Sequence, residues 1–259
     1  MSILNIIIII LVLFGIAVFF RLIKNVFKAA IYVFVLLAIV LFVAGVWVYT
    51  DAAEFRKNIQ EKPLTFILVE DDEMLAGTKI LNMRDVDYLL FSNSTISEYQ
   101  EYFNNKNFEK IRGDSYKLFV FNFSVLENYK KNFSYRKYNI THEEAMTFLK
   151  SDMPIDDAVD YFAKAYNQEN DVFKEGFKEE LLDSFENDHK FKGALFSFFV
   201  ADMLPTQTLY IVKNMKSKEI TVYPETAMFK ALNYIPESWV LKSAERGGEN
   251  QSEVLEEKG

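Results

Sequence analysis

Two histidines and several groups of carboxylates are the residues of this sequence whose types could support catalysis or metal binding. His142 opens the segment HEEAM, which lacks the second histidine that a zinc-protease helix carries four residues after the first. His189 also stands outside any metal-ligand pattern. The sequence contains no cysteine, so disulfides, thiolate nucleophiles and cysteine metal sites are excluded. We therefore assign neither histidine a catalytic or metal-binding role.

The carboxylates form two groups along the chain. Residues 70–73, EDDE, lie on a predicted hairpin turn, and oxygen ligands of this kind suit Ca²⁺. They lack the alternating spacing and central glycine of a calcium loop, which favours a solvated turn. The second group surrounds a predicted helix start, where the helix dipole already stabilises negative charge, and it consists of Asp152, Asp156, Asp157 and Asp160. Helix capping is the preferred interpretation there.

Other catalytic patterns are missing or remain open. The chain has no Gly-x-Ser-x-Gly turn, and its nine glycines form no phosphate-binding loop. A glycosidase needs two carboxylates at a set separation, which a sequence does not reveal. Aromatic residues around 129–138 could stack on sugars or complete a hydrophobic core, and the core is the stronger interpretation; they are Tyr129, Phe133, Tyr135 and Tyr138. We assign no catalytic residue, cofactor or metal.

The N-terminal residues 1–50 are strongly apolar. Residues 3–20 and 29–49 are uncharged runs, and a helix of about 20 residues spans a bilayer. The linker 21–28, RLIKNVFK, is short, so we predict two transmembrane helices that return as an antiparallel hairpin and contact the lipid bilayer through residues 3–49. A cleaved signal peptide is the alternative, but a basic N-terminal region and a small-residue cleavage site are both missing.

Small residues on the two runs suggest a further possibility for the hairpin. Gly15, Ala38 and Gly45 would allow helices to approach closely, so the hairpin itself could oligomerise. Small residues are common in any membrane helix, and we treat this as a third hypothesis. Substituting the three residues with leucine would test it.

Positive charge predicts the orientation of the hairpin. The linker carries Arg21, Lys24 and Lys28 without any acid, which places it in the cytoplasm, so that both termini and the soluble domain face outward. Basic residues at 56, 57 and 62 lie close to the second run and oppose this bias. Asn-x-Ser/Thr triplets agree with an exterior domain, although an asparagine-rich chain also produces them by chance; they begin at Asn93, Asn122, Asn132, Asn139 and Asn250.

The remaining chain reads as a polar stem at 51–63, a soluble domain at 64–242 and a disordered acidic tail at 243–259. All 37 Asp and Glu residues lie in this part, and the whole chain has a formal net charge of −8. Such a surface repels phosphate backbones, so nucleic-acid binding is disfavoured.

Periodicity indicates strands first and helices afterwards within the soluble domain. Residues 64–70 and 74–82 read as a β-hairpin, and 116–127 as a strand whose aromatic face is buried. Thr141 and Glu144 form a capping-box pattern at a helix start, and Pro154 opens a second helix. Later segments include an amphipathic helix from Asp171, a core helix at 193–204, a second hairpin formed by TLYIVKN and ITVYP, and a short helix from Pro224.

This order predicts an α+β domain with a mixed or antiparallel sheet and about four to five helices after the transmembrane hairpin. The expected function is a membrane-anchored, non-enzymatic interaction, scaffold or accessory module of the cell envelope that binds another membrane or envelope protein. The alternative is a membrane-anchored enzyme that uses carboxylates on an envelope substrate. A deep pocket with two facing carboxylates would favour the enzyme, and an exposed apolar patch would favour the interaction module.

Overall fold

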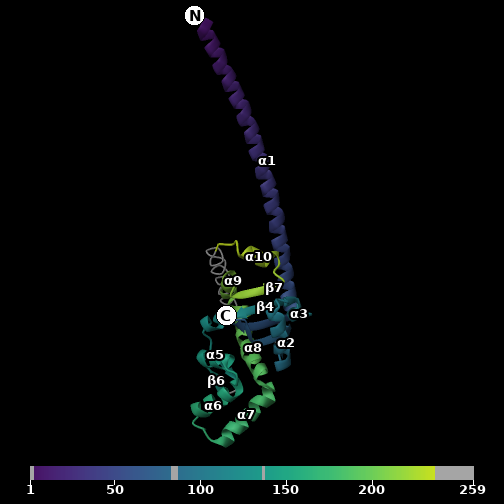
Figure 1. Cartoon of the computed structure of the whole chain (residues 1–259), viewed down its shortest axis with the longest axis vertical. Coiled ribbons are helices and arrows are strands. Elements are labelled where there is room, and N and C mark those ends of the chain that lie inside the picture. The colour runs from purple at the N-terminus through teal and green to yellow at the C-terminus, as the bar shows by residue number, and fades with distance from the viewer. Residues whose placement is uncertain (1–2, 83–86, 136–137, 237–259) are drawn as a thin grey trace, which may run out of the picture. The chain divides into compact units, whose positions relative to one another are not determined.

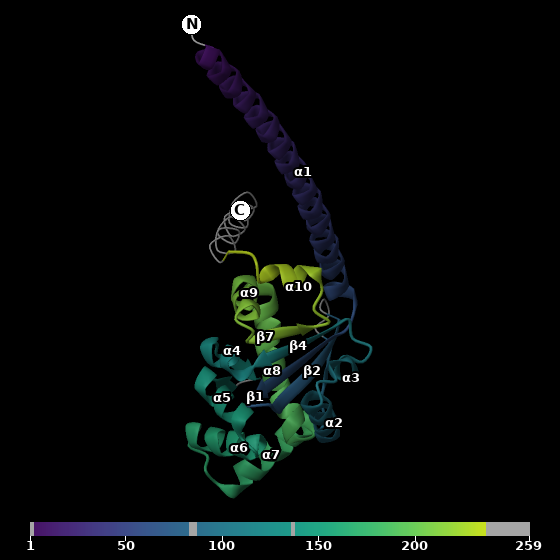
Figure 2. The ribbon, with the colours of Figure 1, turned by 45° about the horizontal axis from the view of Figure 1, so that its top comes forward.

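A computed structural model of the chain describes residues 3–82, 87–135 and 138–236. The chain divides into two compact units, Met1–Thr50 and Asp51–Gly259. The first unit contains most of one helix, and the second is an α+β domain (Figures 1 and 2).

Helix α1 extends without interruption from Ile3 to Glu61. The predicted turn at residues 21–28 is not present, so the structure differs from the expected two-helix hairpin. The linker contains neither proline nor glycine, and nothing in its sequence ends a helix. The predicted stem is helical up to Glu61, and Pro63 stands just before the first strand.

The domain is built on a mixed five-stranded sheet with the order β3-β2-β1-β4-β7. Strands β1 and β4 are parallel, and the other neighbouring pairs are antiparallel. A separate small hairpin pairs β5 with β6. The strands are β1 (Leu64–Glu70), β2 (Glu73–Asn82), β3 (Asp87–Leu90), β4 (Lys117–Asn122), β5 (Phe133–Tyr135), β6 (Tyr138–Ile140) and β7 (Ile220–Tyr223).

Helices cover both faces of the sheet. One cover, formed by α2 (Asn93–Asn104) and α3 (Phe108–Arg112), packs on Ile67 and Val69 of β1. The other cover packs on Leu64, Phe66 and Leu68 and contains most of the remaining helices. They are α4 (Phe123–Asn128), α5 (His142–Lys150), α6 (Pro154–Ala165), α7 (Asp171–Phe185), α8 (Asp188–Thr206) and α9 (Thr208–Lys216), with α10 (Ala227–Leu232) beside α9. Because both faces are covered, the first six residues of β1 are buried.

Several predicted elements are confirmed. Strands β1 and β2 form the expected hairpin, and Thr141 and Glu144 make both bonds of a capping box at the start of α5. Pro154 occupies the first turn of α6. Helix α8 includes the predicted core segment, and its buried residues include Phe196, Phe199 and Val200.

Two predicted strands are wrong in whole or in part. The segment TLYIVKN belongs to helix α9 and not to a second hairpin, while ITVY pairs with β4 as strand β7. The strand expected at 116–127 ends at Asn122, where α4 begins, and it is buried at Leu118 as well as at Phe119 and Phe121. The predicted tail at 243–259 lies outside the described residues.

Candidate functional site

Helix α1 carries the most conspicuous surface of the chain. Within the described side chains, its segment Val26–Glu61 is long and apolar enough to cross a membrane, and none of its apolar window is buried. Trp47 and Tyr49, within this segment, are 74% and 76% exposed. A helix that is apolar on every side and uncovered suits lipid rather than water. Helices α8 and α9 pass the same test as a pair bent by 105°, but α8 is a core helix with ten buried residues.

The last turns of α1 are joined to the domain by specific contacts. The Asp51 carboxylate accepts a hydrogen bond from the backbone N–H of Met228 at 2.6 Å, in the first turn of α10. The Phe55 ring meets the Phe229 ring edge-on, with centroids 5.1 Å apart. These contacts fix residues 51–61 to the domain through a cap and an aromatic pair.

Lys117 lies beside this joint and is only 1% exposed. Burial lowers the pKa of its ammonium, while Asp51 and Glu54 act in the opposite direction. A buried lysine with a low pKa is a candidate nucleophile or base. Its Nζ donates to the carbonyl of Pro224 at 2.7 Å and lies 5.3 Å from the centre of the Phe229 ring, so it serves to link β4 to the segment after β7.

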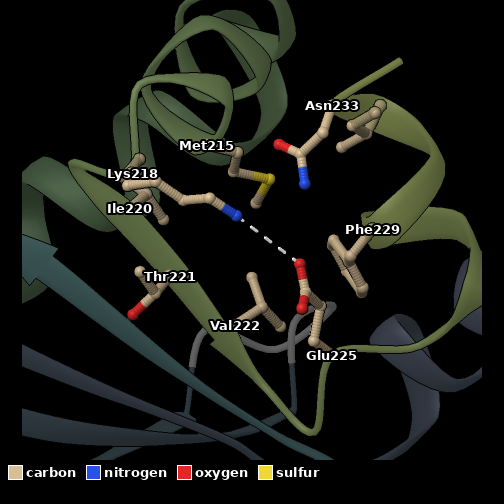
Figure 3. A pocket seen from close by; sticks show the side chains of 9 residues that line it. Met215, Lys218, Ile220, Thr221, Val222, Glu225, Phe229 and Asn233 are labelled. Carbon is tan, nitrogen blue, oxygen red and sulfur yellow. Dashed lines mark ion pairs between the residues drawn. The ribbon is translucent and has the colours of Figure 1, made fainter. Parts of the chain in front are cut away.

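A cavity of about 130 Å³ opens between α9, β7 and α10 (Figure 3). Its single carboxylate, Glu225, forms an ion pair with Lys218 at 3.6 Å, and the two side chains point toward each other in the close-up. The other lining residues are mostly apolar and include Ile220, Val222 and Phe229. This cavity offers space for a small apolar group and lacks the second carboxylate that acid–base hydrolysis needs.

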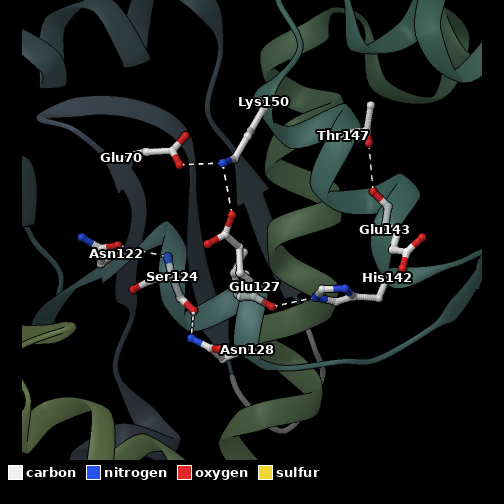
Figure 4. A network of polar contacts seen from close by, with 10 residues as sticks. Glu70, Asn122, Ser124, Glu127, Asn128, His142, Glu143, Thr147 and Lys150 are labelled. Atoms are coloured by element: carbon white, nitrogen blue, oxygen red, sulfur yellow. Dashed lines mark hydrogen bonds and ion pairs between the residues drawn. The ribbon is translucent and has the colours of Figure 1, made fainter.

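The acidic hairpin turn is part of a polar network around Lys150 (Figure 4). Its Nζ lies 2.7 Å from Glu70 and 3.2 Å from Glu127, above the Phe123 ring. The hydrogen bond to Glu70 is the main cause that raises the pKa of Lys150. The two carboxylates therefore share one cation.

Asp71 and Asp72 of this acidic group are the two residues of the turn between β1 and β2. Asp71 and Asp72 have φ angles of 47° and 67°, the left-handed values that a two-residue hairpin turn requires. Aspartate tolerates this conformation better than most residues. Within the described residues, no group of three or more His, Asp or Glu side chains is placed to hold a metal ion.

The second acidic group forms ion pairs between helices. Asp156 lies 2.5 Å from Lys178, and Asp160 lies 2.7 Å from Lys174, so both pairs join α6 to α7. Asp156 and Asp157 also lie in the first turn of α6. The two first-turn positions suit the helix dipole, but the N-cap residue is Met153 and makes no side-chain cap hydrogen bond, so this group does not cap α6 as expected.

His142, the first residue of α5, is half-buried. Its Nε2 lies 2.8 Å from the carbonyl oxygen of Leu126 (Figure 4), and its backbone N–H donates to Asn132 at 2.9 Å. Donation to the carbonyl fixes the proton on Nε2. The His142 side chain thus gives a hydrogen bond to a backbone carbonyl in the last turn of α4.

An open hollow of about 570 Å³ lies beside His142, with Glu143 and Glu144 on its wall. Glu144 accepts the backbone N–H of Thr141 at 2.7 Å, as the capping box requires. A hydrogen bond with Glu144 is also the main cause that raises the pKa of Tyr161 to about 12. The hollow therefore has two carboxylates on its wall, the cap residue Glu144 and the exposed Glu143.

Two titratable residues, the half-buried His189 and the buried Lys192, lie near the start of α8. The Nδ1 atom of His189 is buried and has no hydrogen-bond partner among the described residues, and burial lowers the pKa of its ring. Lys192 is 6% exposed, and burial lowers its pKa as well. The nearby Asp188 accepts the N–H of Ile155 at 3.2 Å, so it caps α6 instead of orienting the imidazole.

Sequence reasoning missed both buried lysines, although a signal was present. Lys117 alternates with Phe119 and Phe121 along β4, which places its side chain on their buried face. Lys192 stands among apolar residues at the start of the most apolar segment of the domain. A charged residue at an expected core position is unusual, and this pattern identifies Lys117 and Lys192 as candidate functional residues.

Of the aromatic residues considered for sugar stacking, Tyr129 and Phe133 are partly buried and pack against the core. Tyr129 packs against Tyr210 with ring centroids 5.5 Å apart, and its hydroxyl donates to Asp202. Phe133 stacks on Phe198 and meets Phe199 edge-on. The side chains of Tyr135 and Tyr138 lie outside the described set.

The glycosylation triplets that the structure describes lie at the surface. Asn93, Asn122, Asn132 and Asn139 are exposed. Asn250 lies outside the described residues.

The chain was compared with protein-family models, curated proteins and solved structures. No protein-family model, no curated protein and no solved structure matches the chain.

Proposed function

We propose that the protein is a membrane-anchored interaction module in which the N-terminal apolar segment holds the α+β domain at a bilayer, where the domain binds another protein. The observation that carries the proposal is the uncovered apolar surface of α1 between Val26 and Tyr49. In water this surface would cost roughly 25 cal/mol for every Å² left exposed, so it needs lipid or a partner to cover it.

The chemistry of the domain supports binding over catalysis. Glu70, Glu127 and Glu225 are held in ion pairs, while His142 and Lys117 bond to backbone carbonyls. An enzyme with two working carboxylates would need a pair that faces one cavity. The 130 Å³ cavity is lined by one carboxylate, and of the two on the wall of the open hollow, Glu144 is engaged in the cap of α5.

Crosslinking in membranes tests the binding function. The full chain, expressed in its own membranes with a C-terminal tag, would be treated with a lysine-reactive crosslinker, solubilised and purified through the tag. We expect a crosslinked species larger than the monomer. A chain that stays monomeric at every crosslinker concentration would contradict the proposal, and turnover of an envelope polymer by the purified chain would favour the enzyme.

The proposal includes both apolar runs as membrane spans. A continuous helix of 59 residues would be roughly 90 Å long, about three times the hydrocarbon core, so residues 3–20 and 29–49 can both lie in lipid only if the chain turns between them. The basic linker would then face the cytoplasm, with the domain outside.

Single cysteines test this topology, because the natural chain has none. Ser2→Cys, Asn25→Cys and Val172→Cys would each be exposed to a membrane-impermeant maleimide in intact and in lysed cells. The hairpin predicts labelling of positions 2 and 172 from outside, and of position 25 only after lysis. Labelling of position 172 alone would indicate one span, and labelling of position 25 alone would reverse the orientation.

A further inference from the structure

Within the described residues, strand β3 forms one edge of the five-stranded sheet and pairs with β2 alone. Its residues Asp87, Tyr88 and Leu89 are exposed, and the two apolar side chains are 42% and 54% accessible. An unpaired strand edge with apolar side chains is a template for another strand. Natural edges usually carry charges or bulges. Here the one charged residue of the strand is Asp87, and the β2–β3 register shifts between Ile80 and Asn82, beyond the regular pairing of Tyr88, Leu89 and Leu90.

The register identifies the backbone groups that point outward. The N–H of Phe91 donates to the carbonyl of Gly77 at 3.2 Å, so these residues form a hydrogen-bonded pair. Pairs alternate along an antiparallel ladder, so Leu89 directs its backbone toward Lys79 of β2, whereas Tyr88 and Leu90 direct theirs away from the sheet. No hydrogen bond from the described part of the chain reaches these two outward N–H groups and two outward carbonyls.

We propose that β3 pairs with β3 of a second copy of this chain, antiparallel and with Leu89 on the two-fold axis. In this register Tyr88 of each copy faces Leu90 of the other, and each such pair exchanges two hydrogen bonds. All four outward backbone groups of each strand are then satisfied by the same residues in the other copy. A two-fold interface requires such self-complementarity.

The side chains suit the same register. The two Leu89 residues form the central non-hydrogen-bonded pair, in which side chains approach most closely. On the other face, Tyr88 lies beside a mostly apolar cavity of about 60 Å³ that also borders Ile80, Ala194 and the half-exposed Phe198. Pairing would cover this apolar surface.

The charges on β3 permit a second copy as the occupant. With Leu89 on the axis, Asp87 faces Phe91 of the other chain, so the two Asp87 carboxylates are not opposed. Two chains that are each acidic overall can then meet along an uncharged stretch at Tyr88, Leu89 and Leu90.

The contact is small and depends on the proposed membrane anchoring. A four-residue edge buries far less than the roughly 800 Å² per partner of a stable interface. Anchoring two copies in one bilayer raises their effective concentration and can compensate for a weak contact. The ten-stranded sheet is therefore expected in membranes and not in dilute detergent.

A single cysteine tests the pairing in the full, otherwise cysteine-free chain. Leu89→Cys in native membranes, treated with a mild oxidant, should give a disulfide-linked dimer on a non-reducing gel, because the two β-carbons would lie about 4.5–5.5 Å apart. Val172→Cys on α7, at a position 81% exposed, is the control for random collision and should give roughly tenfold less dimer.

Two substitutions at Tyr88 separate the backbone contribution from the side-chain contribution. Tyr88→Pro removes an outward N–H and leaves the β2 ladder intact, so in the Leu89→Cys background it should lower dimer formation roughly tenfold. Tyr88→Ala keeps that N–H and should lower it much less. Normal expression and protease resistance of both variants would show that they fold.

Three results would overturn the inference. They are a Leu89→Cys yield no higher than that of Val172→Cys, an unchanged yield with Tyr88→Pro, and an adduct whose mass identifies a different protein. Lysine crosslinking of the natural chain in the same membranes separates this failure from failure of the proposed function. A crosslinked partner without a Leu89→Cys dimer would refute only the β3 pairing, whereas no crosslinked species of either kind would refute both.

Discussion

His142, Glu144 and Tyr161 show how individual polar residues of this domain serve its backbone. His142 satisfies the Leu126 carbonyl, and Glu144 completes a cap on α5. Each group is engaged in a local bond that a buried or half-buried polar atom requires. Histidine and glutamate can both act in catalysis, but His142 and Glu144 lie next to helix ends, where they satisfy backbone hydrogen bonds.

The cap at Thr141 gives a prediction at the residue scale. Thr141→Ala removes the side-chain acceptor for the N–H of Glu144 and should lower the free energy of unfolding by about 1 kcal/mol. Thr147→Ala in the same helix is the matched control, because its exposed hydroxyl bonds only to the carbonyl of Glu143. Thermal unfolding of the full chain in detergent would compare them. Equal effects of the two substitutions would contradict the role of the cap.

Tyr129 gives a pH-dependent prediction. Burial, followed by the hydrogen bond to Asp202, raises the pKa of its hydroxyl to about 12, against an unfolded value near 10. The folded chain thus keeps a proton that the unfolded chain loses. The contribution of Tyr129 is complete below pH 10 and is lost as the pH rises from 10 to 12.

The stability difference between the natural chain and Tyr129→Phe should therefore shrink across that interval. Tyr234→Phe is the control, since Tyr234 is 88% exposed. Urea unfolding in detergent at pH 8, 10 and 11.5 would measure both differences. A Tyr129→Phe difference that stays constant with pH would contradict the assigned environment.

Helices and strands of this domain could be predicted where the local sequence pattern fits only one type of secondary structure. The Thr141–Glu144 cap, Pro154 in the first turn of α6 and the spacing of Phe177 and Leu181 in α7 each predicted the observed helix. The β1–β2 hairpin was predictable because two strand-like segments flank an acidic turn.

Helix α9 was not predictable in the same way. Its segment TLYIVKN is rich in residues that favour strands, yet Ile211 and Met215 are also spaced for one helix face that packs on the core. Packing of Ile211 and Met215 against the core stabilises the helix over the strand. The parallel pairing of β1 with β4 likewise depends on segments far apart in the chain, and the alternation within each strand contains no information about its partner.

The contact between α8 and β2 gives a prediction at the element scale. A β-carbon added to Gly193 would lie 2.9 Å from the backbone oxygen of Gly77, whereas one added to Gly176 in α7 would meet nothing within 4 Å. Gly193→Ala should lower the free energy of unfolding by roughly 1–3 kcal/mol through overpacking. Gly176→Ala should raise it by up to about 1 kcal/mol through helix propensity. Thermal unfolding would measure both, and a change of the same sign would contradict the close approach.

Across the whole molecule, two units of opposite character follow each other in the chain. Residues up to Thr50 include no acidic side chain, and the following unit contains all of them. The apolar unit is suited to lipid and the acidic one to water, which is the division that an anchored module needs.

Alkaline extraction of membranes tests the anchoring most directly. Membranes that contain the tagged full chain would be washed with carbonate at about pH 11, and the pellet and supernatant compared by blotting and intact mass. We expect the chain of 259 residues in the pellet, because a helix inserted in the hydrocarbon core resists the wash. Release into the supernatant, either intact or shortened at its N-terminus as a cleaved signal peptide would leave it, would contradict the membrane anchor.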